Sequence, residues 1–128
     1  MKKKIAILGS TGSIGKTLFN ILKKDKKNFE IVLLTADKNY KDLLNQAKVF
    51  NVKNIILTNK DIFLKINKKK LSHKINVYNN FEIINKLFKK KIDYVMSSIS
   101  GMEGLNPTLN IIKHTNIIAI ANKEAIIC

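Results

Sequence analysis

Residues 4–22 read KIAILGSTGSIGKTLFNIL, and the order of residue types in this stretch decides the fold. The apolar run at 5–8 predicts a buried strand, and the glycine-rich segment at 9–15 follows it directly. Apolar residues then recur at helical spacing and predict a helix that buries them: Ile14, Leu18, Ile21 and Leu22. A strand, a glycine-rich turn and a helix in this order form a site for the phosphates of a dinucleotide. The glycines let backbone N–H groups approach the ligand, and the start of the helix favours negative charge.

The spacing of the glycines is G-x-x-G-x-x-G, which differs from the plain G-x-G-x-x-G fingerprint. Taken alone, this spacing is also compatible with a strand-to-helix turn that binds no ligand. The hydroxyl groups of Ser10, Thr11 and Ser13 add hydrogen-bond donors for a phosphate. With a strand before it and a helix after it, the turn favours the phosphate-binding interpretation.

Length and composition indicate one globular domain. The chain has 128 residues, 45% of them hydrophobic, which is enough for one core and leaves little room for a second domain. No apolar run approaches the roughly 18 residues that a membrane span needs. The opening MKKK passes directly into the first strand without the apolar region of a signal peptide, so we expect a cytoplasmic protein that does not bind membranes. The single cysteine, Cys128, excludes a disulfide framework and a cysteine-based metal site.

The net charge of +15 raises the question of nucleic-acid binding. All 24 basic residues are lysine, whereas arginine makes the commonest base-specific contacts. The lysines are spread along the chain, which is also rich in Ile and Asn. These three residue types share A/T-rich codons, so a biased genome explains the pattern without any binding partner. We therefore expect a solvated surface and no nucleic-acid partner.

Strands and helices alternate along the whole chain. Apolar runs predict further strands at 30–36, 54–58, 75–78, 93–98 and 117–121. Helical spacing predicts helices at 40–50, 62–66, 81–88 and 105–112, the last marked by Leu105, Leu109 and Ile112. Asn39 and Asn80 stand where they can cap two of these helices. Such alternation, with strands that are apolar throughout, predicts an α/β, Rossmann-like doubly wound fold: a mainly parallel sheet with helices on both faces.

Polar segments follow several of the predicted strands. They are the glycine turn, Asp37-Lys38-Asn39 after the second strand, Ser97-Ser98-Ile99-Ser100-Gly101, and Asn122-Lys123-Glu124 after the last strand. In open parallel sheets, ligands lie outside the carboxyl ends of the strands. The sequence therefore predicts a continuous ligand crevice along this edge, with a dinucleotide's adenosine ribose near residues 37–39.

Two stretches resemble a known family, the 1-deoxy-D-xylulose 5-phosphate reductoisomerases. They are the opening stretch at 4–22 and SISGMEGLNPTLNIIKHTNIIAIANKEAII at 98–127, and the motifs GSTGSIG and ANKE together are much more specific than either alone. The resemblance spans the chain, with residues 49–80 fitting only loosely. It implies an enzyme that uses NADPH and a divalent cation, Mg²⁺ or Mn²⁺. Its reaction would rearrange and reduce 1-deoxy-D-xylulose 5-phosphate to 2-C-methyl-D-erythritol 4-phosphate, in the non-mevalonate route to isoprenoids.

The resemblance also implies roles for individual residues. It assigns the NADPH pyrophosphate to Thr11, Gly12, Ser13 and Ile14, the 2′-phosphate of the adenosine ribose to Lys38 and Asn39, and further cofactor contacts to Asn122 and Glu124. Lys123 would reach the sugar-phosphate substrate. Simpler interpretations stay open: Lys38 as a surface lysine, Asn122 and Lys123 as a helix cap and a solvated charge, and Glu124 as an acid at the start of a helix.

Asp37 departs from the family pattern, which commonly has glycine at this position. An acidic residue after the second strand usually accepts a hydrogen bond from a free ribose 2′-hydroxyl and repels a 2′-phosphate. The adjacent Lys38 could offset this effect, or Asp37 could point to solvent. We keep NADPH as the expected cofactor, and NADH stays open.

Members of the family are considerably longer than this chain, and their metal ligands lie in a later Asp-Ser-Glu segment and beyond. The resemblance therefore implies that residues 1–128 are an NADPH-binding domain truncated at its C-terminus, without the catalytic and metal-binding domain. No catalytic residue and no metal ligand is expected here. Without a cation to polarise the substrate oxygens, we expect the chain to be inactive alone. The full-length enzyme is expected to be a homodimer.

Two alternatives of other classes remain. Another NAD(P)-dependent enzyme with a similar turn, such as a semialdehyde dehydrogenase, would share the first thirty or so residues but would not be expected to carry ANKE after the last strand. A basic nucleic-acid-binding module would bind in a strongly salt-dependent way and would ignore nicotinamide nucleotides.

Overall fold

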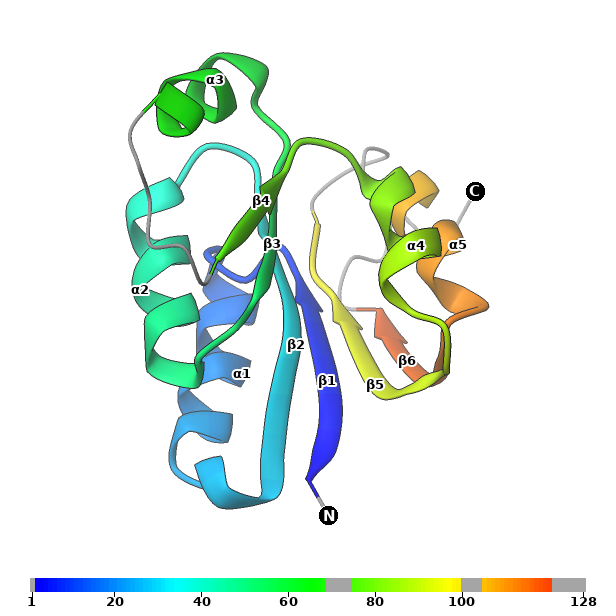
Figure 1. The fold of residues 1–128 in the computed structure, drawn as a ribbon. Helices are drawn as coiled ribbons and strands as arrows, with labels where there is room; N and C mark the ends of the chain where they lie inside the picture. Colours follow the sequence, from blue (N-terminus) through cyan, green and yellow to red (C-terminus); the bar gives the residue numbers. More distant parts are fainter. Residues whose placement is uncertain (1, 69–74, 100–104, 121–128) are drawn as a thin grey trace.

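A single sheet of six strands runs through the residues that the structure describes. The structure is a computed structural model, and it describes residues 2–68, 75–99 and 105–120. The strands are β1 Lys3–Leu8, β2 Phe29–Ala36, β3 Asn54–Leu57, β4 Asn76–Tyr78, β5 Ile92–Ser97 and β6 Thr115–Ile120. Their order is β4-β3-β2-β1-β5-β6, and every pairing between them is parallel (Figure 1). The predicted α/β fold with a parallel sheet is confirmed.

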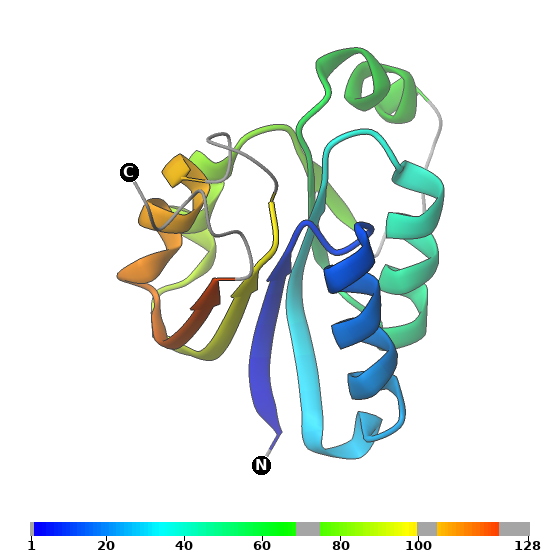
Figure 2. The same cartoon turned by 180° about the vertical axis from the view of Figure 1, so that it is seen from behind.

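Helices cover both faces of this sheet. They are α1 Ser13–Lys23, α2 Tyr40–Phe50, α3 Lys60–Lys68, α4 Ile84–Leu87 and α5 Leu105–Ile112. The first three pack on one apolar cluster, which includes Phe19, Leu43 and Ile66, whereas α4 and α5 pack on a second cluster around Ile84 and Ile111. Figures 1 and 2 show α1 and α2 together on one side of the sheet. The chain winds outward from β1 to β4 and then returns to β5 beside β1, which makes the fold doubly wound and Rossmann-like.

Strand β1 shows why these strands are apolar throughout. Ile5 and Ile7 belong to the cluster under α1 and α2, and Ala6 and Leu8 belong to the cluster under α4 and α5. Successive side chains of a strand point to opposite faces, and both faces are covered by helices. An alternating polar pattern would therefore place polar groups in one of the two cores.

The buried face of α1 differs from the predicted one. Ile14 is 48% exposed and Ile21 is 59% exposed, whereas Gly15, Phe19 and Leu22 are buried. The prediction that Ile14 and Ile21 face the core is therefore wrong. Leu18 and Leu22 contact the core as predicted. The rest of the buried face consists of Gly15 and Phe19, because Gly15 packs closely against the turn that precedes the helix.

The bounds of α2 and α5 were predicted correctly, and those of α3 and α4 only in part. Asn39 caps α2, since its side-chain oxygen accepts a 3.2 Å hydrogen bond from the Asp42 N–H. Asn80 likewise accepts from the Glu82 N–H at 3.1 Å, but the predicted helix at 81–88 is a 3-10 turn, Phe81–Ile83, followed by the single turn α4. In α5, Ile111 is buried in the core and the predicted Ile112 is 43% exposed, while the side chains of Leu105 and Leu109 lie outside the described part of the chain.

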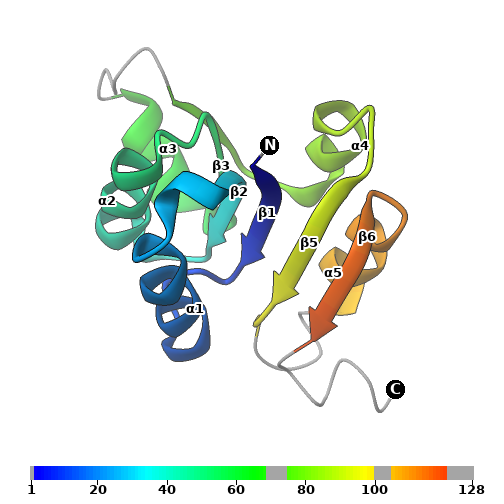
Figure 3. The ribbon, with the colours of Figure 1, turned by 90° about the horizontal axis from the view of Figure 1, so that it is seen from below.

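A shallow apolar hollow lies on the α1 face of the sheet. It has a volume of about 490 Å³ and is lined by Leu18 of α1, Phe29 of β2, Tyr94 of β5 and Ile117 of β6, among others. In Figure 3, α1 and α2 lie on one side and α4 on the other, with β5 and β6 extending away from α1. On the face that carries α1, helix cover is therefore fuller over β1 and β2 than over β6, where Ile117 is 59% exposed.

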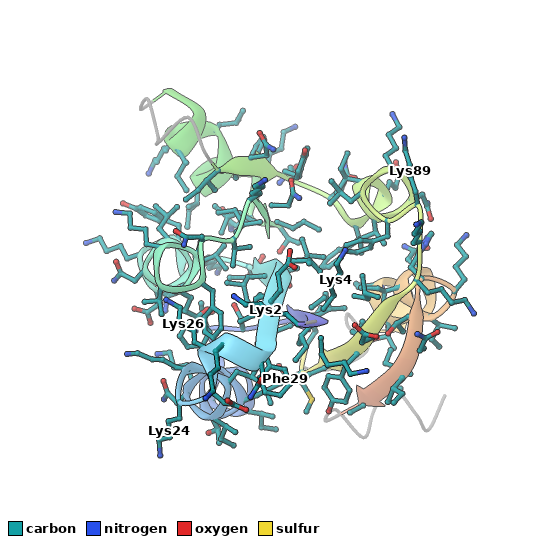
Figure 4. All side chains as sticks on the ribbon, turned by 60° about the horizontal axis from the view of Figure 1, so that its bottom comes forward. Lys2, Lys4, Lys24, Lys26, Phe29 and Lys89 are labelled. Atoms are coloured by element: carbon teal, nitrogen blue, oxygen red, sulfur yellow. The ribbon has the colours of Figure 1, made fainter. Side chains whose placement is uncertain are left out.

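The lysines project from several sides of the molecule. Figure 4 shows Lys24 and Lys89 on opposite sides, with both side chains extending away from the ribbon. One labelled lysine makes a cation–π contact: the Lys26 ammonium lies 5.7 Å from the centre of the Phe50 ring. Within the described ranges, no helix is long and apolar enough to cross a membrane.

The corrected face of α1 can be tested with two adjacent substitutions. Leu22 is 4% exposed and Ile21 is 59% exposed. We expect Leu22→Ala to lower the free energy of unfolding by about 2–5 kcal/mol, because it leaves a cavity in the core. Ile21→Ala should change it by less than about 1 kcal/mol. Urea denaturation measures both, and equal losses in the two variants would contradict the assigned face.

Candidate functional site

A pocket of about 540 Å³ opens at the carboxyl edge of the sheet, where the winding of the chain reverses between β1 and β5. Its wall is formed by the turn after β1, the ends of β2 and β3, the residues that follow β5, and two residues from the other helical layer, Phe81 and Pro107. This is the place where ligands bind in doubly wound sheets. The predicted crevice is therefore present between the segments that the structure describes.

The glycine turn is held in place by a very close approach between Gly9 and Gly15. Gly9 has φ of +75°, a conformation that L side chains rarely adopt, and an added Cβ would lie 3.2 Å from Ser98. A Cβ on Gly15 would overlap the Gly9 carbonyl oxygen and would lie 2.7 Å from the Ser10 Cα. These two glycines are therefore required by the fold itself, whether or not a ligand is bound.

Polar groups from other elements bind the inner side of the turn. The Gly9 N–H donates to Thr35 Oγ1 at 2.9 Å, and the Ser10 N–H donates to the Thr35 carbonyl oxygen at 2.9 Å. The Ser98 hydroxyl lies 2.9 Å from the Leu8 carbonyl oxygen and 3.0 Å from that of Gly9. Strands β2 and β5 thus hold the turn from both sides, and its outer side faces the pocket.

Gln46 supports the same turn from α2. Its Nε2 donates a 3.0 Å hydrogen bond to the Ser10 carbonyl oxygen, and the residue is only 7% exposed. Its Oε1 is buried and has no hydrogen-bond partner within the described ranges. The sequence prediction missed both Gln46 and Thr35. Each is a polar residue on an otherwise apolar helix face or strand, which indicates a buried hydrogen bond. The sequence does not show which group accepts or donates that bond.

Gly12 differs from the other two glycines of the turn. An added Cβ would have only one contact, at 3.7 Å from the Gly9 carbonyl oxygen, which is ordinary van der Waals distance. Its backbone, with φ −74° and ψ 172°, is one that any residue adopts. Gly12 is exposed and lines the pocket. The fold therefore does not explain this glycine, whereas a ligand that approaches the backbone closely would.

Helix α1 begins beside Gly12 without a side-chain cap, in contrast to α2. Ser13 and Ile14 form its exposed first turn, where backbone N–H groups have no partner in the helix ladder. An anion placed here would be favoured by these donors and by the helix dipole. The pocket, the open surface of Gly12 and the uncapped helix start together fit a dinucleotide phosphate.

The segment after β2 forms another part of the site. The Thr58 hydroxyl donates to Asp37 Oδ1 at 2.7 Å, which holds this carboxylate beside the pocket. Lys38 is exposed, and the Asn39 amide is used in capping α2, where its Nδ2 also donates to Asp42 Oδ2 at 2.8 Å. Asp37 therefore does not simply point to solvent. The sequence prediction missed Thr58, which follows a different strand.

A charged contact links the first turns of α1 and α2. Lys16 Nζ lies 2.9 Å from Asp42 Oδ2, and both side chains are partly exposed. The hydrogen bond from Lys16, with a further one from Asn39, lowers the pKa of Asp42 below its ordinary value of 3.8. This contact joins the helix that starts at the glycine turn to the helix that starts beside Lys38.

The predicted site residues fall into three groups. Thr11 and Gly12 line the pocket, while Ser13 and Ile14 begin the helix next to it. Lys38 and Asn39 follow β2 at the same edge of the sheet. Asn122, Lys123 and Glu124 lie outside the described residues. No group of three or more His, Cys, Asp or Glu side chains able to hold a metal ion occurs in the part of the chain that the structure describes.

A family comparison agrees with the motifs. The profile of the 1-deoxy-D-xylulose 5-phosphate reductoisomerase family matches residues 5–128. The chain is 59% identical over 128 residues to the 1-deoxy-D-xylulose 5-phosphate reductoisomerase of Pelagibacter ubique, a match that covers 98% of this chain and 33% of that relative. The chain therefore spans about a third of the length of such curated relatives.

Solved structures of the same family have the same fold. One is a 1-deoxy-D-xylulose 5-phosphate reductoisomerase from Zymomonas mobilis in complex with NADPH, with a TM-score of 0.87 and 25% identity over 98% of this chain and 33% of that one. Another is a DOX-P reductoisomerase in complex with NADPH, fosmidomycin and magnesium, with a TM-score of 0.80 and 26% identity over 97% of this chain and 31% of that one.

The different roles of the glycines lead to a stability test. Gly15→Ala places a methyl group into backbone atoms, so we expect it to lower the free energy of unfolding by at least about 1–3 kcal/mol. Gly12→Ala should change it by less than about 1 kcal/mol, because its Cβ has room. Thermal and urea unfolding of the two variants measure this difference. Similar destabilisation by both would show that the space at Gly12 is misassigned.

The contact between Lys16 and Asp42 makes the fold pH-sensitive in a defined direction. The pKa of Asp42 is lower in the folded chain than in the unfolded one, so the contact stabilises the fold above the unfolded pKa. This stabilisation is lost as the pH falls through the lower folded pKa. Lys16→Met should raise the pKa of Asp42 toward 3.8, as measured by NMR titration of the carboxylate.

Lys24→Met removes an exposed lysine of similar chemistry at the other end of α1 and should leave the Asp42 titration unchanged. An unchanged Asp42 titration in Lys16→Met would refute the assigned contact.

Proposed function

This chain belongs to the 1-deoxy-D-xylulose 5-phosphate reductoisomerase family, and from that premise we propose that it is the NADPH-binding part of such an enzyme. The complete enzyme would rearrange and reduce 1-deoxy-D-xylulose 5-phosphate to 2-C-methyl-D-erythritol 4-phosphate, a step of isoprenoid biosynthesis. Because the chain spans a third of its relatives' length, this reaction is proposed for the whole protein and not for these residues alone. The match over residues 5–128 supports this assignment over a semialdehyde dehydrogenase that shares only the opening turn.

The observation that carries the proposal is the open backbone of Gly12 at the uncapped start of α1. A pyrophosphate placed against Gly12 would approach the N–H groups of the first helical turn, with Ser13 and Ile14 at that turn and Thr11 beside it in the pocket wall. These donors are fixed by the turn, so binding requires little reorganisation of the protein.

The adenosine end of the cofactor is proposed to lie beside the segment after β2. Lys38 supplies a cation there, which suits the 2′-phosphate of NADPH. Asn39 already caps α2 with its side chain, so its contribution is to fix the path of the backbone next to Lys38. NADPH supplies the hydride when it is bound, and the residues of this chain bind and orient it.

The other end of the site is proposed to involve the residues after β6. This strand ends at Ile120, which is paired with Ser97 at the edge of the sheet that carries the pocket. Asn122 and Glu124 follow closely in sequence and are proposed to contact the cofactor, with Lys123 reaching the sugar-phosphate substrate. An ammonium group can donate several hydrogen bonds to a phosphorylated polyhydroxy compound.

The metal-dependent part of the reaction is not assigned to the described residues, because their acidic and histidine side chains do not gather into a site. A solved relative contains magnesium and fosmidomycin together with NADPH. We propose that the divalent cation and the catalytic groups belong to the portion of the family that this chain does not match, and that residues 1–128 turn over no substrate alone. We further propose a cytoplasmic homodimer for the complete enzyme, without a nucleic-acid or membrane partner.

Nucleotide binding by the 128-residue chain tests the proposal directly. We expect NADPH to bind, and we expect Gly12→Ala to weaken binding at least tenfold, because its methyl group occupies the space of the pyrophosphate. Titration monitored by NADPH fluorescence gives the dissociation constants. Asn20→Ala, an exposed change further along α1, serves as the control and should bind like the parent chain. Failure of the folded parent chain to bind NADPH would overturn the proposal.

A further inference from the structure

Asp37 stands where Rossmann-like folds distinguish NAD from NADP. It follows β2 directly and lies about 20 residues after the third glycine of the turn, where a carboxylate typically binds a free ribose 2′-hydroxyl. It also lines the 540 Å³ pocket. Its position in the chain does not by itself show that the carboxylate contacts a ribose, because the side chain of an exposed aspartate after a strand can turn into solvent.

Thr58 fixes the orientation of the Asp37 carboxylate. Its hydroxyl donates the 2.7 Å hydrogen bond to Asp37 Oδ1, and Thr58 lines the same pocket from the end of β3. The backbone is held as well, since the Asp37 carbonyl oxygen accepts from the Asn59 N–H at 2.9 Å. Asp37 Oδ2 has no hydrogen-bond partner within the described parts of the chain. One carboxylate oxygen is therefore fixed, and the other can accept a hydrogen bond from a ligand.

The Lys38 cation attracts a 2′-phosphate, whereas the Asp37 anion repels it. The described residues contain one salt bridge, between Lys16 and Asp42, so the exposed Lys38 is not paired with a carboxylate among them. A 2′-phosphate at this edge would meet the Lys38 cation and the Asp37 anion on adjacent residues, and the attraction and repulsion would partly cancel. A free 2′-hydroxyl would meet an available acceptor at no electrostatic cost.

We infer that Asp37, held in place by Thr58, weakens the discrimination of this site between NADPH and NADH. It accepts a hydrogen bond from the ribose 2′-hydroxyl of NADH and opposes the 2′-phosphate of NADPH, so the two nucleotides bind with affinities within about tenfold of each other. This inference rests on the proposed function, because it requires a nicotinamide nucleotide in the pocket. It adds a specificity-determining carboxylate and a residue that positions it.

The test is the ratio of the NADH and NADPH dissociation constants for the 128-residue chain and its variants. Asp37→Asn should shift this ratio about tenfold in favour of NADPH, the effect of removing one charge next to the phosphate and weakening one acceptor for the hydroxyl. Thr58→Val keeps the charge of Asp37 but removes the hydrogen bond that orients its carboxylate. It should weaken the binding of NADH several-fold and shift the ratio less than Asp37→Asn does. The gain in NADPH affinity of Asp37→Asn should shrink near 1 M salt, where charge interactions are screened.

Glu30→Gln is the matched control, because it removes one exposed carboxylate at the opposite end of the same strand, β2. It should leave the ratio unchanged, and circular dichroism establishes that each variant is folded. An unchanged ratio in both Asp37→Asn and Thr58→Val, with NADPH still bound, would overturn the inference and leave the proposed function intact. Absence of binding of either nucleotide to the folded chain would overturn the proposed function and the inference with it.

Discussion

The contact between Gly15 and the Gly9 carbonyl group is the constraint on which the rest of the structure depends. No side chain can enter this contact, so it fixes how α1 leaves the turn and how the helix is rotated. That rotation directs Phe19 and Leu22 into the core and leaves Ile14 and Ile21 exposed. It also leaves Gly12 in the wall of the pocket and the uncapped start of the helix exposed beside it, so a single backbone contact orders both the core and the site.

The turn is bound on its inner side by protein and left open on its outer side. Thr35, Gln46 and Ser98 come from β2, α2 and the end of β5, and together they hold the backbone of residues 8–10. A loop fixed in this way keeps its outward N–H groups in place before any anion arrives. The contact between Lys16 and Asp42 extends the same support to the start of α2, beside the segment where Asp37 and Lys38 lie.

The apolar runs predicted the strands and their parallel arrangement, because strands buried on both faces must be apolar throughout. Asn39 allowed the start of α2 to be placed, since a capping residue acts locally, and the helical spacing of the apolar residues up to Phe50 placed its end. In α1, Leu18 and Leu22 were predicted correctly to contact the core, but Ile14 and Ile21 were not. Ile14 and Gly15 both begin sets of residues with helical spacing, and the contact with Gly9 selects the set that begins at Gly15. Thr58 and Gln46 were missed for a similar reason: their partners, Asp37 and Ser10, lie far away in sequence. Asp37 itself was recognised from its place after β2, but its orientation was not.

The central place of β1 in the sheet has a consequence for synthesis on the ribosome. Of the six strands this one is synthesised earliest, and Ile5 pairs with Ile31 of β2 on one side and with Tyr94 of β5 on the other. The second partner is translated only after β2, β3 and β4. At the usual rate of about 5–20 residues per second, one edge of β1 waits several seconds for its neighbour. Throughout that interval the nascent chain carries an unpaired apolar strand edge, which makes it a substrate for chaperones and a hazard for aggregation.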